Sequence, residues 1–223
     1  MARNMGLDSM RIRHSLVLTS LLGLVVAAGC TTTSEGEPRP ADTGAATSGP
    51  TSGASGDDDE LPFAGAPEVD DPLDTSRYEQ DPCASITAEQ AQQDLNLPPA
   101  GRPMDNVALG VGCEWKNNDT RAYLHIVFVV DDPRGLSPEY EVNEKGGWDF
   151  FEELPEIEGY PAIARDRPDD RSRGYCTVVV GVADDMSFES TLQLRGSNIG
   201  KKDPCEMAAF AAGLALRTMK EGA

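Results

Sequence analysis

Cysteine is the residue type whose number and spacing in this chain most directly suggest chemistry. Five cysteines occur among 223 residues. One of them, Cys30, lies near the N-terminus, and the other four are spread over the rest of the chain: Cys83, Cys113, Cys176 and Cys205. The odd count becomes even if Cys30 has a role of its own, so the two groups are interpreted separately.

Cys30 follows a segment typical of an export signal. Three arginines precede an uncharged run at residues 15–28, which is shorter than the ~20 apolar residues that a membrane span needs. Small residues directly before Cys30 resemble a bacterial lipobox, although Ala27 stands where leucine is usual. We expect residues 1–29 to be a lipoprotein signal peptide and Cys30 to carry the lipid on the outer face of the cytoplasmic membrane. The alternative is an ordinary secretory signal with a coincidental cysteine.

The segment after the lipidation site has the composition of a tether. Between residues 31 and 80, Thr, Ser, Gly, Pro and Ala dominate, and 12 acidic residues face only two arginines. Such a segment buries too little apolar surface to offset the loss of chain entropy, so residues 30–80 are predicted to be a disordered acidic tether. The acidic run at residues 57–60 lacks the spaced ligands of a calcium loop, which favours a spacer over a metal site.

The four remaining cysteines are predicted to form two disulfides, because disulfides persist in exported proteins. Four cysteines allow three pairings. Nearly equal separations favour Cys83 with Cys113 and Cys176 with Cys205. Metal binding by the same four residues is the alternative, but no C-x₂-C spacing supports it. We therefore expect neither a metal nor a cofactor.

Residues 81–223 have the length of a single domain. Capping patterns at Thr87/Gln90 and Asp203/Glu206 predict helices over residues 88–95 and 204–220. Between them, an apolar period of two predicts strands at residues 112–116, 122–130, 160–165, 174–183 and 187–195, the last two joined in a hairpin. The pattern indicates an α+β domain, with an antiparallel sheet of about five strands packed against an N-terminal and a C-terminal helix.

One aromatic segment is a candidate binding element. Trp148, Phe150 and Phe151 lie within four residues and follow two glycines. The simpler interpretation is a short helix that packs Trp148, Phe151 and Leu154 onto the sheet. The alternative is an aromatic lip over a ligand groove.

Catalytic and nucleic-acid-binding functions find little support. His125 is the only histidine beyond the signal segment, and its strand context favours a structural role over a general base. No familiar nucleophile or phosphate-loop motif occurs. A net charge of −19 argues against nucleic-acid binding. The arginines of residues 165–173 alternate with aspartates, which indicates a solvated loop or a site for an acidic partner or anionic glycan.

Together these motifs resemble an actinobacterial group of exported lipoproteins that is classed as a domain of unknown function. The likeness rests on the lipobox, the tether, the two Asp-Pro-Cys tripeptides and the strands around Cys113 and Cys176. It implies a small extracytoplasmic α+β domain with two disulfides and no established activity.

The expected function is non-catalytic ligand binding or sensing by a domain held at the membrane through its lipid. An accessory subunit of a cell-envelope membrane complex is one alternative, and a hydrolase of unrecognised type is another. The partner would be an envelope protein or a small molecule, and no nucleic acid is expected.

Overall fold

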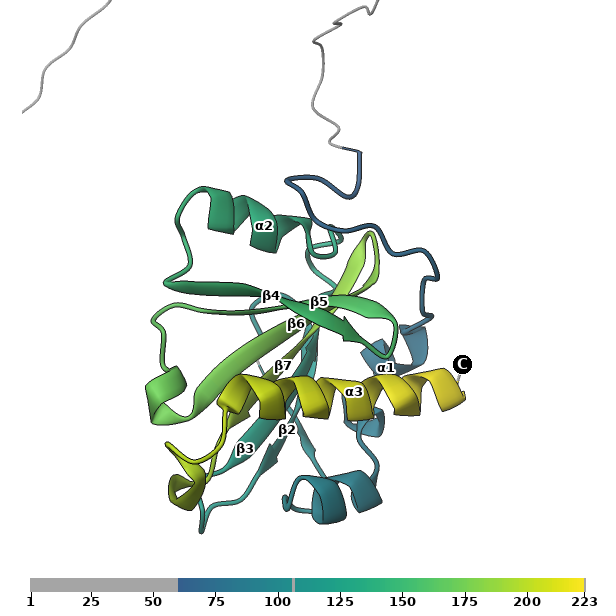
Figure 1. Ribbon diagram of the computed structural model, residues 1–223. Coiled ribbons are helices and arrows are strands. Elements are labelled where there is room, and N and C mark those ends of the chain that lie inside the picture. Colours follow the sequence, from purple (N-terminus) through teal and green to yellow (C-terminus); the bar gives the residue numbers. More distant parts are fainter. Residues whose placement is uncertain (1–59, 106, 223) are drawn as a thin grey trace, which may run out of the picture. The chain divides into compact units, whose positions relative to one another are not determined.

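A computed structural model of the chain describes residues 60–105 and 107–222. The predicted signal peptide, Cys30 and most of the predicted tether lie outside these residues. The described chain contains an antiparallel sheet with one long helix across it (Figure 1).

Residues 60–80 pack onto the domain, although the sequence analysis assigned them to the tether. Val69 and Tyr78 are buried. The amide of Val69 donates to Asp184 Oδ1 at 2.9 Å, and that of Leu73 donates to Val182 O at 2.9 Å. The boundary predicted at residue 81 is therefore too late. The average composition of this segment is polar, but a few of its apolar residues, such as Val69 and Tyr78, are buried against the domain.

A single sheet organises the domain. Within the described residues its order is β1-β2-β3-β7-β6-β5-β4, and every neighbouring pair is antiparallel. The strands are β1 Arg102–Pro103, β2 Val111–Lys116, β3 Tyr123–Phe128, β4 Phe150–Ile157, β5 Tyr160–Asp166, β6 Tyr175–Ala183 and β7 Met186–Gln193.

The five predicted strands correspond to β2, β3, β5, β6 and β7, and the predicted hairpin joins β6 to β7. The α+β class with an antiparallel sheet is confirmed, but the sheet has seven strands rather than about five. The two missed strands lie at its edges. β1 contains only two residues, and β4 carries glutamates that break the apolar alternation on which strand prediction depends.

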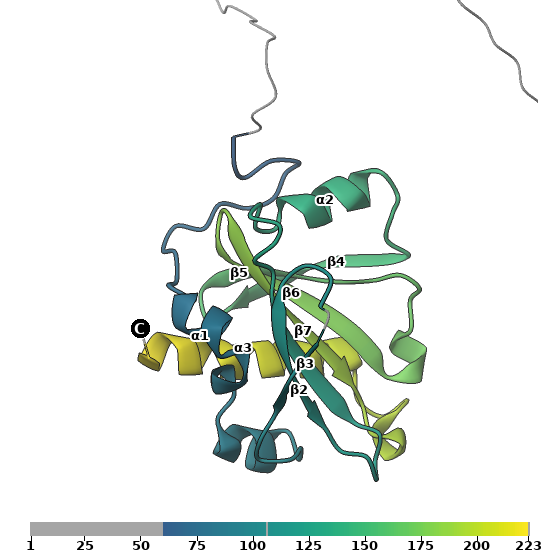
Figure 2. The ribbon, with the colours of Figure 1, turned by 180° about the vertical axis from the view of Figure 1, so that it is seen from behind.

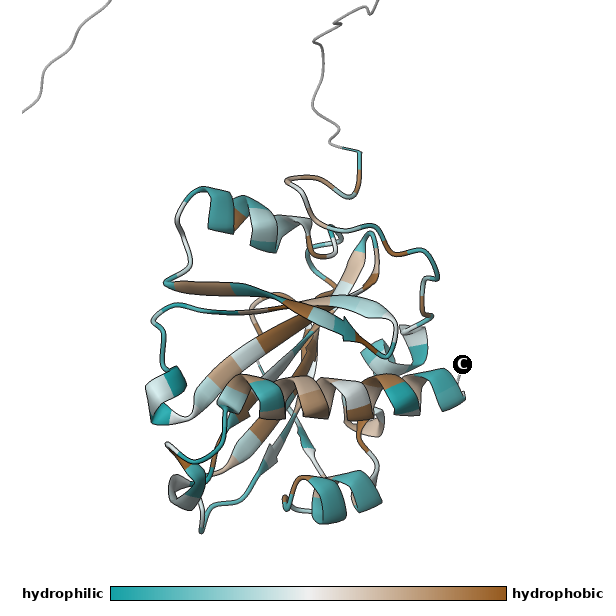
Figure 3. Cartoon of the chain, in the orientation of Figure 1, coloured by the Kyte–Doolittle hydropathy of each residue, from teal (hydrophilic) through white to brown (hydrophobic). Residues whose placement is uncertain are grey.

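Helix α3, Pro204–Gly222, covers one face of the sheet and confirms the predicted C-terminal helix. It crosses in front of β6 and β7 in Figure 1 and lies behind the sheet in the reverse view of Figure 2. Asp203 caps it as expected, because its Oδ1 accepts from the amides of Cys205 at 2.7 Å and Glu206 at 3.2 Å. Hydrophobic residues are concentrated along the inner strands and the middle of this helix (Figure 3).

The predicted N-terminal helix is present over residues 88–94, and its second half is wider than an α-helix. Thr87 and Gln90 form the reciprocal capping bonds, with Thr87 N donating to Gln90 Oε1 at 2.7 Å and Gln90 N to Thr87 Oγ1 at 3.2 Å. The turn they open, Gln90–Asp94 (η2), is a π-helix of one turn. It ends at Asp94, and Asn96 just beyond it has a left-handed φ of 55°. Two further helices, α1 Ser76–Gln80 and α2 Ser137–Glu144, were not predicted.

Both predicted disulfides are present. Cys83 pairs with Cys113, and Cys176 pairs with Cys205. The first joins the 3-10 helix Pro82–Ser85 (η1) to β2, and the second joins the first turn of α3 to β6. Loops of 30 and 29 residues correspond to about 3–4 kcal/mol of stabilisation each in the chain-entropy description. The disulfides therefore hold α3 and η1 against the sheet.

Candidate functional site

One row of side chains crosses four strands on the face of the sheet opposite α3. Lys116 of β2 lies beside Tyr123 of β3, Tyr123 beside Gln193 of β7, and Gln193 beside Tyr175 of β6. The residues next to them along the strands, including Trp115 and Leu124, belong to the core under α3. Because side chains alternate along a strand, this row points away from that core.

The row forms the floor of a cavity of 680 Å³ at one end of the sheet. The loop between β2 and β3 supplies one wall through Thr120 and Arg121. The segment before β6 supplies another through Asp170 and Arg173, and residues that follow β7 complete the lining. Three separate stretches of chain thus meet at this cavity.

The β2–β3 loop is held in shape by Asn117. Its Oδ1 accepts from the amides of Asp119 at 3.0 Å and Thr120 at 3.1 Å. The next residue, Arg121, has a left-handed φ of 61°, which a non-glycine residue seldom adopts. Glycine or asparagine would be less strained there. The arginine side chain is consistent with a role at the cavity that glycine could not fill.

The cavity brings positive charge together in an acidic protein. Of its basic residues, Arg173 is paired with Asp170 at 3.3 Å. Lys116 and Arg121 have no ion-pair partner within the part of the chain that the structure describes. Both are therefore available to an anion that enters from solvent.

The cavity also offers neutral groups for hydrogen bonding. Burial, with smaller contributions from Tyr175 and nearby carboxylates, raises the pKa of Tyr123 to about 12. Its phenol therefore remains protonated under ordinary conditions. Gln193 is held by bonds from its Nε2 to the carbonyls of Arg173 at 2.9 Å and Leu194 at 3.2 Å. This fixed amide keeps the floor rigid.

His125 lies one row away and has a structural environment. Its Nε2 is 3.2 Å from Glu114 Oε2, and its ring stacks on Tyr123 with centroids 4.5 Å apart. Burial lowers the pKa of His125, and the contact with Glu114 offsets this only in part. In the described residues no hydroxyl or thiol is hydrogen-bonded to its ring. The arrangement lacks the nucleophile that a catalytic dyad requires.

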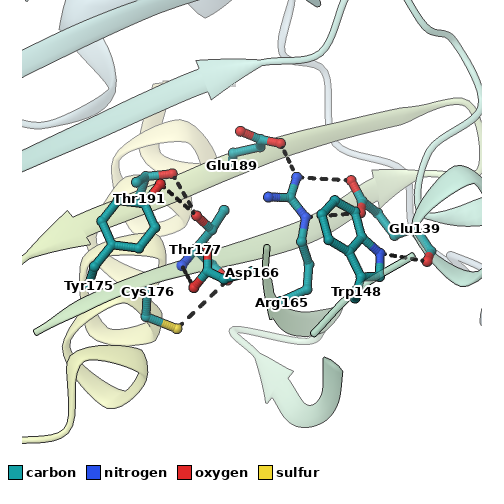
Figure 4. Close-up of polar contacts among 9 residues, drawn as sticks. All are labelled: Glu139, Trp148, Arg165, Asp166, Tyr175, Cys176, Thr177, Glu189 and Thr191. Carbon is teal, nitrogen blue, oxygen red and sulfur yellow. Dashed lines mark hydrogen bonds and ion pairs between the residues drawn. The ribbon is translucent and has the colours of Figure 1, made fainter. Parts of the chain in front are cut away.

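Beside the cavity, a polar cluster lies between β5, β6 and β7 (Figure 4). Asp166 is buried, and its Oδ2 accepts from the amide of Thr177 at 3.2 Å. The Thr177 hydroxyl lies 3.2 Å from that of Thr191 and 3.5 Å from the Tyr175 hydroxyl. Burial raises the pKa of Asp166 to about 6, even though Thr177 and Arg165 act in the opposite direction.

The aromatic segment does not form the predicted helix, and neither Trp148 nor the phenylalanines after it lines the cavity over Tyr123. Residues 150–157 are the edge strand β4. The Arg165 guanidinium lies over the Trp148 ring, 4.5 Å from the ring centroid. Trp148 Nε1 donates to Glu139 O at 3.1 Å (Figure 4). Gly146 and Gly147 follow α2 and lead the chain into β4. The closely spaced aromatic residues therefore lie at the start of a strand and do not share one face of a helix.

Phe150 and Phe151 point to different faces of the sheet. Phe150 packs against the core under α3, with Arg171 stacked 3.4 Å from its ring centroid. Phe151 meets Tyr140 of α2 edge to face, with centroids 5.3 Å apart. Because consecutive residues of a strand alternate, the two rings cannot form one surface.

Arg165 instead links three elements. From β5, its guanidinium contacts Glu139 of α2, with Nε 2.9 Å from Oε2, and also pairs with Glu189 of β7. Only 13% of its side chain is exposed. The predicted solvated loop therefore begins with a structural arginine, and the loop residues that reach the cavity are Asp170 and Arg173.

The sequence analysis missed the cavity residues Lys116, Arg121, Tyr123 and Tyr175. Strand alternation could have placed Tyr123 and Lys116 on one face, since both belong to predicted strands. The pairing of β3 with β7, rather than with the next strand in sequence, brings Tyr123 and Tyr175 together. That long-range register cannot be read from local patterns.

The chain matches one known protein family. Residues 25–218 match DUF3558, described as a protein of unknown function. The chain belongs to this family. The predicted grouping with a domain of unknown function is thus confirmed. No curated protein and no solved structure matches this chain.

The location of the DUF3558 domain follows from its cross-links. Two disulfides are typical of proteins outside the reducing cytosol, so the domain is extracytoplasmic. Across residues 60–105 and 107–222, no helix has the length and apolarity of a membrane span. In the same residues, no group of three potential metal ligands gathers.

Arg165→Met should destabilise the domain by about 3 kcal/mol, because it leaves the carboxylates of Glu139 and Glu189 close together without their counter-charge. Urea unfolding at neutral pH measures the change. Arg173→Met removes an exposed pair and should cost less than about 1 kcal/mol. Equal losses in the two variants would contradict a special role for Arg165.

Asp166→Asn should remove a pH-dependent part of the stability. Folded Asp166 holds its proton up to about pH 6, whereas an unfolded aspartate releases it near its ordinary pKa of 3.8. Its contribution to the free energy of unfolding is thus fully present below about pH 4 and is lost as the pH rises to about 6.

Urea unfolding of the wild type and the Asp166→Asn variant between pH 4 and 7 tests this. The difference in unfolding free energy, wild type minus variant, should fall with rising pH and level off above about pH 6. A difference that stays constant over this range would show that the pKa of Asp166 is not raised in the folded protein.

Proposed function

We propose that this protein is a lipid-anchored, extracytoplasmic binding domain, and that the cavity over Tyr123 and Tyr175 binds a small anionic ligand, with acidic sugars as the favoured class. The proposal rests on one observation. Two unpaired cations, Lys116 and Arg121, and two tyrosines line a single 680 Å³ cavity in the described part of a strongly acidic protein.

The charge pattern supports an anionic ligand. A net charge of −19 repels anions over most of the surface, so a local pair of free cations is the exception. Arginine and lysine bind carboxylates through charge-assisted hydrogen bonds. The ligand should therefore carry a carboxylate or a comparable negative group that lies between Lys116 and Arg121.

The tyrosines support a ligand with a ring. An aromatic side chain presents a broad apolar face and, at its edge, a polar hydroxyl. A sugar ring has matching apolar faces and peripheral hydroxyls. Tyr123 and Tyr175 lie on either side of Gln193, whose anchored amide offers a further polar contact.

Binding without catalysis is favoured over hydrolysis. His125 is paired with Glu114 and stacked on Tyr123, away from any bonded nucleophile in the described part of the chain. Asp166, whose pKa is raised, is hydrogen-bonded to Thr177 and is buried. Neither group is placed to transfer a proton to a ligand over Tyr123.

The anchor is proposed from sequence, since Cys30 lies outside the described residues. A Cys30→Ser variant should be exported yet released from the membrane, because acyl chains supply the attachment at ~0.8 kcal/mol per buried methylene. Fractionation of cells, with the protein detected by antibody, measures the distribution. A variant that stays with the membrane fraction would rule out Cys30 as the anchor.

Ligand binding can be tested with digalacturonate on the soluble chain from residue 31 onward. The charged disaccharide should shift the amide NMR signals of Tyr123, Tyr175 and Gln193, whereas neutral maltose should not. Lys116→Gln should weaken binding about ten-fold, the effect of one lost charge-assisted contact.

Arg121→Gly provides a matched control for stability. It removes the guanidinium and relieves the left-handed backbone, so binding should fall while the melting temperature stays the same or rises. Equal shifts with maltose, or shifts centred away from β3, β6 and β7, would overturn the proposal.

A further inference from the structure

A second groove lies on the other side of the domain, between the edge strand β4 and helix α3. Its volume is 640 Å³. Leu154 and Ile157 of β4 form one apolar wall, and Ala209, Phe210 and Gly213 of α3 form the other. It shares no residue with the cavity over Tyr123.

Phe210 is the most unusual residue of this groove. It is 43% exposed, on a helix whose other large apolar side chains pack inward. Only Leu109 and Ile199 are comparably exposed large hydrophobic residues in the described chain. An exposed aromatic ring at the mouth of an apolar groove is typical of a surface that binds another molecule.

Gly213 gives the groove its depth. It sits inside a helix of 19 residues, where glycine costs about 1 kcal/mol relative to alanine. An added Cβ would meet Ile157 Cγ2 at 3.4 Å and Arg217 Nη1 at 3.5 Å, which are ordinary contacts. Packing therefore does not require glycine. The missing side chain instead leaves space between the helix and β4.

The rim of the groove is acidic. Only one basic residue, Arg217, lines it, and that residue is already paired with Glu158. The other charged side chains at the rim have no ion-pair partner among the residues described: Glu152, Glu156, Asp203 and Glu206. Asp203 is engaged as the N-cap of α3. Glu152, Glu156 and Glu206 still outnumber the basic side chains at the rim, so an acidic rim around an apolar floor favours a ligand that is both basic and apolar.

The position of β4 suggests the conformation of that ligand. β4 ends the sheet order and, in the described chain, pairs only with β5, so the backbone groups on its outer edge are not paired with another strand. Its glutamates repel acidic strands, including β4 of a second copy of this protein. A strand that carries lysine or arginine would be attracted by the same residues.

We propose that the groove between β4 and α3 binds an extended segment of a partner protein that carries both aliphatic and basic residues on the side facing α3. The aliphatic side chains enter between Leu154, Ile157 and Phe210. The basic side chains lie over Glu152, Glu156 and Glu206. The segment follows β4 and adds to the edge of the sheet.

The test uses a fluorescently labelled heptapeptide, Lys-Ser-Leu-Ser-Val-Ser-Lys, whose lysine and aliphatic side chains share one face of an extended chain, and the chain from residue 31 onward. Fluorescence anisotropy should show saturable binding that weakens with added salt, because the charges are exposed. A Glu-Ser-Leu-Ser-Val-Ser-Glu peptide and a Lys-Ser-Ser-Ser-Ser-Ser-Lys peptide should not bind at the same concentrations. Equal binding of the peptide without aliphatic residues would show mere charge attraction and overturn the proposal.

Variants locate the binding site. Phe210→Ala and the double change Glu152→Gln with Glu156→Gln should each weaken peptide binding about ten-fold. The charge-matched control, Glu68→Gln with Glu144→Gln, changes two exposed glutamates that lie outside the groove and should leave binding unaltered. If both glutamate pairs had the same effect, the groove would not be the site.

Gly213→Ala separates folding from binding. It should raise the free energy of unfolding, because alanine is the better helix former, while it shallows the groove and weakens peptide binding several-fold. A more stable variant with unchanged peptide affinity would contradict binding of the peptide in this groove. Because the residues are separate, digalacturonate binding at the other cavity should be unaffected by these changes.

Discussion

The packing of α3 against β6 and β7 is the contact on which the rest of the structure depends. It buries the apolar side of the central strands and, through Cys176–Cys205, fixes the start of the helix to the sheet. Ser190 of β7 adds a buried hydrogen bond to Ala208 O at 2.9 Å. With one face occupied in this way, the side chains of the other face are available for different tasks.

That second face is divided between two kinds of environment. At one end, α2 covers Ile163 and Val179, and Arg165 joins α2 to the sheet through Glu139. At the other end, tyrosine, lysine and glutamine side chains line a cavity. Between them lies the buried cluster of Asp166, Thr177 and Thr191, which continues the polar character beneath the surface.

Much of this fold could be predicted from the sequence because its signals are local. The Asp203 cap, the Thr87–Gln90 capping bonds and the β6–β7 hairpin each depend on residues a few positions apart. The disulfide pairing was favoured because the two separations are nearly equal and each bond would join the start of a helix to a strand. Edge strands were harder, because β4 has glutamates on both faces and so lacks the alternation of a half-buried strand.

The candidate site was beyond local prediction for a different reason. Tyr123 and Tyr175 are 52 positions apart in the sequence and meet only because β7 lies between their strands. Trp148 was prominent in the sequence because of its size, yet its ring serves to cover Arg165. Large aromatic residues therefore identified a structural contact, whereas the cavity is built from residues of ordinary appearance.

The attachment of residues 63–73 to the domain has a mechanical consequence. These residues bind the end of the domain formed by α2 and the β6–β7 turn, through Ser137, Asp184 and Val182. The cavity lies at the opposite end of β6, about 25 Å away at ~3.3 Å per residue along the strand. A force applied through residues 63–73 would therefore reach the domain at the hairpin turn, while the cavity, at the far end of β6, would not lie in its path.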